Sequence, residues 1–382
     1  MAELVLVLVL LAATAGAWWF LADLRTVPDV TTYGGRPGPS VSVVVPARDE
    51  EETLPAVLQS LQHVDEVGEV VVVDDDSQDG TAAAARAGGA VVLAAGTPPA
   101  GWTGKAWACH VGARDTDGDL LFFVDADTTL APGALAGLLH LHHRHGGLVS
   151  VQPFHRVVRP YEQLSAYFNA VSVMASGAFA RRHGSRPMAF GPCLLTSRAD
   201  YERAGGHASV RGEVLDDVRL AAAYDRAGLS VTCVLGGRSV RMRSYPGGFR
   251  QLADGWTKNI ASGAAAASPL ATAVSVAWVG SHHAVAVGAG TALLAAAGPE
   301  APWAHGHLAF WLVAWTVVAL QLAWVLRRVG SFRWWTWAVF PVPLQVFDAL
   351  FARSAALTTV RRTVRWRGRD VAVGHRSAEG GA

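Results

Sequence analysis

The stretch that decides the fold is Leu120-Leu121-Phe122-Phe123-Val124-Asp125-Ala126-Asp127. Its apolar run, bounded by Gly118-Asp119 and Thr128-Thr129, predicts a strand buried on both faces of a sheet. Asp125 and Asp127 stand where this strand ends, and open α/β sheets bind ligands beyond the carboxyl ends of their strands. Two carboxylates this close repel each other unless a cation lies between them, and such oxygen ligands suit Mg²⁺ or Mn²⁺. A turn with helix-capping acids is the alternative that this stretch alone leaves open.

Acidic and polar residues gather at three further element ends. The strand predicted over 41–45 ends at Pro46-Ala47-Arg48-Asp49-Glu50, and the strand over 70–73 ends at Asp74-Asp75-Asp76-Ser77. Asp216-Asp217 precede a helix predicted over 218–227. Solvated acids scatter along a chain, whereas acids concentrated at strand ends indicate one site. The metal-site hypothesis is therefore favoured over the turn.

The composition points to a protein that lies partly in lipid. Of 382 residues, 51% are hydrophobic and only 16% are charged, which is typical of chains with membrane segments. The net charge of +1 gives no electrostatic footprint for nucleic acid. The cysteines, Cys109, Cys193 and Cys233, are odd in number and widely spaced, so we expect neither a disulfide framework nor a zinc site, and a reducing compartment.

The chain predicts membrane segments on both sides of an α/β domain. Residues 4–22 carry no charge and are long enough to span a bilayer. A cleaved signal peptide is the competing interpretation, but it would require basic residues at the start, where only Glu3 stands. Basic residues follow instead, and the positive-inside rule then places the next domain in the cytoplasm. We predict an N-terminal transmembrane helix (1–24), a linker (25–40), a catalytic domain (41–265), a membrane domain (266–357) and a basic tail (358–382).

Between residues 41 and 260, strand-like and helix-like segments alternate, which predicts a mostly parallel α/β sheet. The expected strands are 41–45, 70–73, 91–94, 120–124 and 148–151, with helices such as 54–61 and 81–87 between them.

The C-terminal third of the chain has long apolar segments in place of the alternating pattern. They lie at 271–297, 308–326 and 334–357, and the last is interrupted by Pro341 and Pro343. A third full span would carry the arginines of 361–369 outside, against the positive-inside rule. We therefore predict a multi-pass protein of the cell membrane in which 334–357 forms a re-entrant or interfacial pair of half-helices.

A series of motifs, in order, carries a resemblance to a known family. They are Val43–Glu50, Val73–Thr81, Asp125-Ala126-Asp127, Pro99–Trp107, Phe190–Cys193, Gly205-Gly206-His207, Gly255–Asn259 and Trp366–Arg369. The chain resembles family 2 glycosyltransferases, whose catalytic domain is the Rossmann-like GT-A fold. Over about residues 40–370 it is most similar to the membrane-anchored subgroup that includes carotenoid- and hopanoid-associated enzymes.

The resemblance implies a nucleotide-sugar site on the sheet. Asp75, with Asp74 as the less certain contact, would bind the nucleobase or ribose, and Pro46, Arg48 and Glu50 belong to the strand end where the base lies. The alternative for Arg48 is a surface ion pair with Glu50 or Glu51. Lys105 would offset the diphosphate charge. Asp127 is the main expected metal ligand, with Asp125 the second ligand or nearer the sugar.

The resemblance also implies an acceptor side. Asp217 would be the catalytic base, with Asp216 as its substitute, although acids at a helix start also cap free N–H groups. His207 would hydrogen-bond substrate. Lys258 would clamp the diphosphate, with Arg243 as its substitute. Trp256 would belong to the substrate site, with an interfacial membrane anchor as the alternative. The family's polysaccharide synthases carry Arg before this Trp, and Gly255 here counts against a polymer synthase.

Together these features predict an inverting, Mg²⁺- or Mn²⁺-dependent glycosyltransferase. Its donor would be a nucleoside diphosphate sugar, most simply UDP-linked, and its acceptor a membrane lipid such as a carotenoid, hopanoid or other polyprenoid. A polyprenyl-phosphate glycosyltransferase or polysaccharide synthase is the first alternative. A non-catalytic nucleotide-binding membrane scaffold is the second.

Two groups of histidines carry weaker hypotheses. The cluster His140, His142, His143 and His145 predicts a solvated or lipid-facing helix surface more readily than a metal site. His282 and His283 stand in an apolar segment, where they would bond across helices or line an acceptor path.

Overall fold

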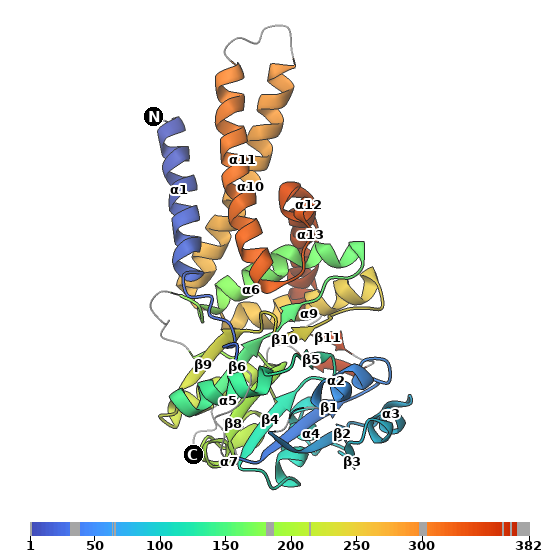
Figure 1. The fold of residues 1–382 in the computed structure, drawn as a ribbon. Helices are drawn as coiled ribbons and strands as arrows, with labels where there is room; N and C mark the ends of the chain where they lie inside the picture. The colour runs from blue at the N-terminus through green and yellow to red at the C-terminus, as the bar shows by residue number, and fades with distance from the viewer. Residues whose placement is uncertain are drawn as a thin grey trace, which may run out of the picture. The chain divides into compact units, whose positions relative to one another are not determined.

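The computed structural model describes residues 2–30, 39–62, 64, 66–180, 187–213, 215–297, 304–360, 363–366 and 369–372. The chain divides into two compact units (Figure 1). We call residues 24–156 and 184–244 the sheet unit, and residues 1–23, 157–183 and 245–382 the helical unit. Segments 157–183 and 245–265, which the sequence groups with the catalytic domain, thus pack within the helical unit.

The sheet unit is built on a seven-stranded sheet of order β3-β2-β1-β4-β8-β6-β9. Neighbouring strands of this sheet are parallel, except that β8 is antiparallel to both β4 and β6. The predicted α/β, mostly parallel sheet is confirmed. The strands are β1 (Val41–Ala47), β2 (Val67–Asp74), β3 (Val91–Ala94), β4 (Leu120–Val124), β6 (Leu148–Gln152), β8 (Cys193–Ser197) and β9 (Val231–Leu235).

The buried β-branched runs form the strands that the sequence predicts, and two predicted strands, β3 and β4, have the observed bounds. The pattern did not predict β8 and β9 of the large sheet. It also did not predict a second sheet of order β5-β10-β7, formed by β5 (Thr128–Leu130), β10 (Val240–Met242) and β7 (Phe154–His155). These strands are short, and no long apolar run marks them.

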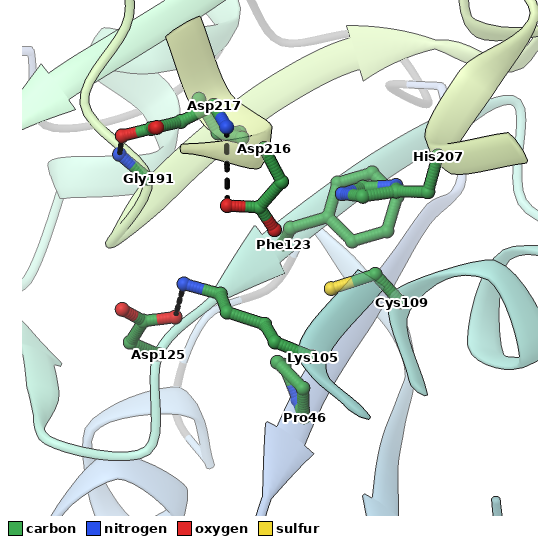
Figure 2. Close-up of a pocket in the computed structure, with 10 residues that line it drawn as sticks. Pro46, Lys105, Cys109, Phe123, Asp125, Gly191, His207, Asp216 and Asp217 are labelled. Carbon is green, nitrogen blue, oxygen red and sulfur yellow. Dashed lines mark hydrogen bonds and ion pairs between the residues drawn. The ribbon is translucent and has the colours of Figure 1, made fainter. Parts of the chain in front are cut away.

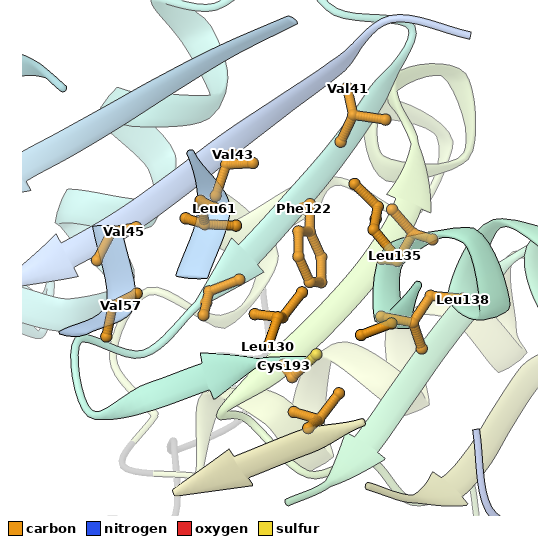
Figure 3. Packing of buried hydrophobic residues seen from close by; sticks show 14 of the residues in the cluster. Val41, Val43, Val45, Val57, Leu61, Phe122, Leu130, Leu135, Leu138 and Cys193 are labelled. Atoms are coloured by element: carbon orange, nitrogen blue, oxygen red, sulfur yellow. The ribbon is translucent and has the colours of Figure 1, made fainter. Parts of the chain in front are cut away.

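Helices cover both faces of the large sheet. They are α2 (Leu54–Leu61), α3 (Thr81–Ala87), α4 (Gly104–Arg114), α5 (Ala134–His145), α7 (Arg198–Arg203), the 3-10 turn η2 (Gly206–Val210) and α8 (Asp216–Arg226). Because side chains alternate along a strand, Val43 and Val45 of β1 pack with α2 and α5 (Figure 3), whereas Val44 packs with α4 and α8 on the other face.

The strand order creates a crevice between β1 and β4. The chain leaves β1 outward to β2 and β3 and then returns to form β4 on the other side of β1. Such a topological switch point is where open α/β sheets bind ligands. The acid-bearing ends of β1, β2 and β4 meet at this edge.

Among the described residues of the helical unit, two helices are long and apolar enough to cross a membrane, Pro269–Ala296 and His307–Val329, which suggests membrane association. Its N-terminal helix α1 has a shorter apolar part, Val7–Phe20. The elements are α1 (Ala2–Phe20), η1 (Pro160–Ser165), α6 (Ala166–Ser176), α9 (Phe249–Ala266), α10 (Pro269–Ala296), α11 (Ala304–Val329), α12 (Trp334–Ala338), α13 (Pro341–Val360), β11 (Thr363–Trp366) and β12 (Arg369–Ala372).

Several polar side chains of this unit form hydrogen bonds between its helices. Gln321 of α11 accepts a hydrogen bond from the Trp278 indole of α10 (2.8 Å) and donates one to the Thr14 carbonyl of α1 (3.1 Å). His282 bonds the Tyr167 hydroxyl (2.7 Å). These bonds join α1, α10 and α11 into a bundle, with α6 bonded to α10 (Figure 1).

The last apolar segment breaks where the sequence predicts, because α12 ends at Ala338 and α13 begins at Pro341. Arg353 of α13 pairs with Asp254 of α9 at 2.6 Å, and Ser354 donates to the Thr257 carbonyl of the same helix at 2.8 Å. A re-entrant course for this pair of helices stays a prediction. Residues 31–38 of the predicted linker and most of the basic tail lie outside the described residues.

Candidate active site

A pocket opens in the sheet unit at the carboxyl ends of β1 and β4 (Figure 2). It is lined by Pro46, Lys105, Cys109, Phe123, Asp125, Gly191, Leu194, His207, Asp216 and Asp217. The pocket thus brings together predicted donor-side residues and both residues of the predicted acceptor-side acidic pair.

Lys105 supplies a positive charge to the pocket. The Thr103 side chain caps α4, so Lys105 lies in the first turn of that helix. Its Nζ lies 2.6 Å from Asp125 Oδ1. Burial alone would lower the pKa of Lys105, but the charges of Asp125 and Asp216 raise it well above its ordinary value. The ammonium group therefore stays charged at any working pH.

Asp127 lies close to two other carboxylates, those of Asp125 and Glu50. Burial, together with the charges of Asp125 and Glu50, raises the pKa of Asp127 to about 7. Such a carboxylate lacks compensating positive charge, which a divalent cation would provide. Among the residues that the structure describes, no three His, Cys, Asp or Glu side chains form a ready-made metal site. Asp125 and Asp127 still fit Mg²⁺ or Mn²⁺, because such ions commonly take one or two carboxylates and complete their shell with phosphate oxygens and water.

The ends of β1 and β2 form a second polar cluster. Arg48 Nη1 donates to the Asp75 carbonyl at 2.7 Å and lies 3.6 Å from Asp75 Oδ2, so the Arg48 guanidinium faces the neighbouring strand end. Asp75 packs against the start of α4, where a Cβ on Gly104 would collide with its carboxylate. Asp74 Oδ1 accepts the Ser77 N–H (3.0 Å), which shapes the turn.

The two acids at the start of α8 have different surroundings. Asp217 accepts two backbone N–H groups, from Gly191 at 2.8 Å and from Val218 at 2.9 Å. Asp216 accepts the Asp217 N–H (3.1 Å), and its carboxylate points toward the side of the pocket where Lys105 lies (Figure 2). Burial and the Asp216 charge raise the pKa of Asp217 to about 6, against the lowering effect of Lys105 and the two N–H groups. Asp217 is thus a carboxylate that can accept a proton near neutral pH.

His207 lines the pocket as a neutral group. Its ring bonds the Tyr201 hydroxyl at 2.8 Å and lies edge-on to Phe123, with ring centroids 4.8 Å apart. Burial, followed by the charge of Lys105, lowers the pKa of His207 to about 3. It can offer a hydrogen bond but carries no charge.

Four lining residues were not predicted as site residues: Cys109, Phe123, Gly191 and Leu194. Two of them had a signal in the sequence. Cys109 follows Lys105 by four residues and therefore shares its helix face, and Gly191 lies in the Phe190–Cys193 motif.

Trp256 and Lys258 belong to α9 of the helical unit. The Trp256 indole donates to Ser165 Oγ at 2.9 Å and stacks on Phe168 at 4.8 Å, which accounts for its burial. Their place in the substrate site stays a prediction. In the same unit, His283 Nε2 lies 2.6 Å from Asp348 Oδ2, so both predicted membrane histidines bond across helices.

The fold is shared with solved glycosyltransferases. A mannosyltransferase from Pyrobaculum calidifontis, solved with GDP-Man and Mn²⁺, matches 91% of this chain and 96% of its own with a TM-score of 0.50 and 20% identity. The fold of this chain is therefore that of a GT-A domain.

Sequence comparisons give the family. Residues 42–204 match the family model described as Glycosyl transferase family 2. A 4,4'-diaponeurosporenoate glycosyltransferase of Staphylococcus aureus is 30% identical over 87% of this chain and 88% of its own length. A protein of the same name from Staphylococcus haemolyticus is 33% identical over 63% of this chain and 66% of its own. The chain belongs to glycosyltransferase family 2, and it is similar to carotenoid-related members.

Proposed function

We propose that this glycosyltransferase moves a sugar from a nucleoside diphosphate sugar, UDP-linked, to an oxygen of a membrane lipid of the carotenoid or a related polyprenoid class. The observation that carries the proposal is the pocket in which the Lys105–Asp125 pair and the Asp216–Asp217 pair face one space. The first pair suits a diphosphate and its cation, and the second suits a hydroxyl that must lose a proton. The names of the relatives and the two candidate membrane helices support a lipid acceptor.

The chain's own residues would share the reaction as follows. Asp127 and Asp125 would hold Mg²⁺ or Mn²⁺, which when bound supplies positive charge to the leaving diphosphate. Lys105 would offset charge on the same group. Asp217 would take the proton of the acceptor hydroxyl as its oxygen forms a bond to the anomeric carbon. The bond from that carbon to the diphosphate breaks in the same step, so a single displacement inverts the configuration.

A carboxylate acceptor is the second candidate, and the name of the relatives, an "-oate", favours it. A carboxylate needs no base, so Asp217 would then position the acceptor only. Two acids on the acceptor side would also repel an anion, which is why we place the hydroxyl first. The two candidates can be separated by offering the enzyme a carotenoid with a terminal hydroxyl and, in a second assay, the corresponding carboxylic acid. Transfer to the alcohol supports the hydroxyl acceptor, and transfer to the acid alone supports the carboxylate acceptor.

The first test is turnover by the detergent-purified full chain. UDP- and GDP-linked sugars would be offered with such a carotenoid, with MnCl₂ or with EDTA. We expect a glycosylated lipid from a UDP-sugar with metal and none with EDTA. Glycosylated polyprenyl phosphate or a polymer as the product would establish the family alternatives, and donor binding without any transfer would establish the scaffold.

We also propose that the sheet unit lies in the cytoplasm of a multi-pass membrane protein, because arginines follow the first apolar segment and Arg327-Arg328 stand in the last turn of α11. A reporter fused after Ala382 should be active in its cytoplasmic form. Activity only outside the cell would refute the combination of this orientation with the re-entrant course of α12 and α13.

A further inference from the structure

The segment that leads into β8 is held by a buried serine. Ser150 of β6 is fully buried, and its hydroxyl both accepts the Phe190 N–H (2.6 Å) and donates to the Phe190 carbonyl (3.1 Å). Both backbone polar groups of one residue thus bond to one side chain. Cys233, which pairs with Ser150 across β6 and β9, donates its thiol to the Met188 carbonyl of the same segment (2.9 Å).

The next residue of this segment touches the acceptor-side acid. The Gly191 N–H donates to Asp217 Oδ2 at 2.8 Å, and a Cβ at Gly191 would lie 3.2 Å from that oxygen. Because the N–H of residue 191 belongs to the same peptide group as the Phe190 carbonyl, any rotation of that peptide would break its bond to Ser150 and turn the N–H away from Asp217. The serine and the carboxylate are therefore linked through one rigid planar group.

We infer that Ser150 is a positioning residue for Asp217: it fixes the 190–191 peptide so that the Gly191 N–H orients and stabilises the ionised carboxylate at the acceptor side of the pocket. This inference rests on the proposed function only for its catalytic meaning. The geometric link itself does not depend on which sugar or lipid is used.

Several groups act on Asp217, and Ser150 bonds to two of them, the 190–191 peptide and the Cys233 thiol. Asp216 on α8 raises the pKa of Asp217, Lys105 on α4 lowers it, and the Cys233 thiol on β9 also lies within its field. The Val218 N–H lies within α8 itself. Ser150 carries no charge, and burial raises the pKa of the Cys233 thiol to about 12, so this thiol stays neutral where Asp217 titrates. The removal of Ser150 therefore acts on the titration of Asp217 through the Gly191 N–H. Loss of a hydrogen bond to the charged form raises the pKa of a carboxyl group.

The test is a titration of Asp217 in the full chain, in detergent, with carboxyl-¹³C-labelled aspartate read by NMR. The Asp217 signal is the one missing from Asp217→Asn. We expect Ser150→Ala to raise the pKa of Asp217 by about one pH unit, the equivalent of one charge-assisted hydrogen bond. Ser150→Cys, which keeps the shape but bonds weakly, should give a smaller rise under reducing conditions and serves if the alanine variant fails to fold.

Ser42→Ala is the matched control. Ser42 is a fully buried serine of β1 that likewise bonds two groups, Glu69 Oε1 (2.5 Å) and the Gly118 N–H (2.8 Å). Its loss should lower the melting temperature as Ser150→Ala does but leave the Asp217 titration in place. Equal titrations of Asp217 in the Ser150 and Ser42 variants would overturn the inference.

The pH profile of sugar transfer then separates the inference from the proposed function. If the NMR titration and the acid limb of activity move up together in Ser150→Ala, both hold. If the titration moves but the acid limb does not, Ser150 positions Asp217, but Asp217 is not the base.

Discussion

The acids of the two units differ in how their charge is matched. In the helical unit, Asp254 pairs with Arg353 and Asp348 with His283, each at 2.6 Å. In the sheet unit, several carboxylates lie within the field of Lys105, and two of them, Asp127 and Asp217, have raised pKa values. The two acids of the helical unit each bond a side chain of another helix, and we call them matched acids. The acids around Lys105, which we call crowded acids, outnumber the positive groups beside them, so a bound cation would stabilise their ionised form. The predictions below test this difference.

The largest effect is expected for Asp127→Asn. If Asp127 holds the cation, transfer should fall by about 10³-fold, a typical loss for an electrostatic catalytic group, and Mn²⁺ should no longer raise the melting temperature. Asp119→Asn is the control, since Asp119 lies at the opposite end of β4 and is exposed. Full activity of the Asp127 variant would contradict the metal role.

The same substitution should stabilise the metal-free protein. The folded-state pKa of about 7 lies above the ordinary 3.8, so ionised Asp127 destabilises the fold as pH rises through this interval. Without metal, Asp127→Asn should therefore melt higher than wild type at pH 8 and about equally at pH 4. Thermal melts at both pH values with EDTA check this, and a lower melting temperature at pH 8 would show that the carboxylate is already compensated.

Asp217→Asn should lose about 10²- to 10⁴-fold in transfer to a hydroxyl acceptor, as for a general base, while keeping its affinity for the donor. Asp225→Asn, an exposed acid on the same helix, is the control. Donor binding measured by calorimetry decides the assignment. A collapse of donor affinity would move Asp217 to the nucleotide side.

The wild-type pH profile should show an acid limb near 6. Asp217 must be ionised to accept a proton, so kcat should fall about tenfold for each pH unit below the pKa of about 6 and level off above it. Rates at saturating donor from pH 5 to 8 measure the limb. Its persistence in Asp217→Asn would assign it to another group.

The smallest effect on activity is expected in the helical unit. Asp348→Asn weakens its bond to His283 and should cost about 0.5–1 kcal/mol of stability, with transfer within about twofold of wild type. The melting temperature and the rate of transfer, measured on the same sample of this variant, check both expectations. A loss of turnover as large as that of Asp127→Asn would show that Asp348 also acts in the reaction, which would contradict the difference between the two groups of acids.

The sequence predicted the strands that are long apolar runs and the acids at their ends, because burial and turn chemistry are local. It did not predict β8, whose place between β4 and β6 depends on pairing between segments far apart in the chain. The same limit hid the role of Gly191, since its N–H meets Asp217 only after the sheet has formed. The helix break at Pro341 was predictable because proline acts on its own backbone.

The antiparallel strand β8 also has a consequence for synthesis of the protein. The neighbours of β6 are β8 and β9, and both emerge from the ribosome later. The helical-unit segment 157–183 comes between β6 and β8, so β6 waits as an unpaired edge for roughly 2–8 seconds at ordinary translation rates. During that time a half-built sheet presents an edge that other chains can pair with. Chaperone or membrane-insertion machinery that acts on the 157–183 segment would therefore also affect what fraction of the chains pairs β6 with β8 and β9 and not with another chain.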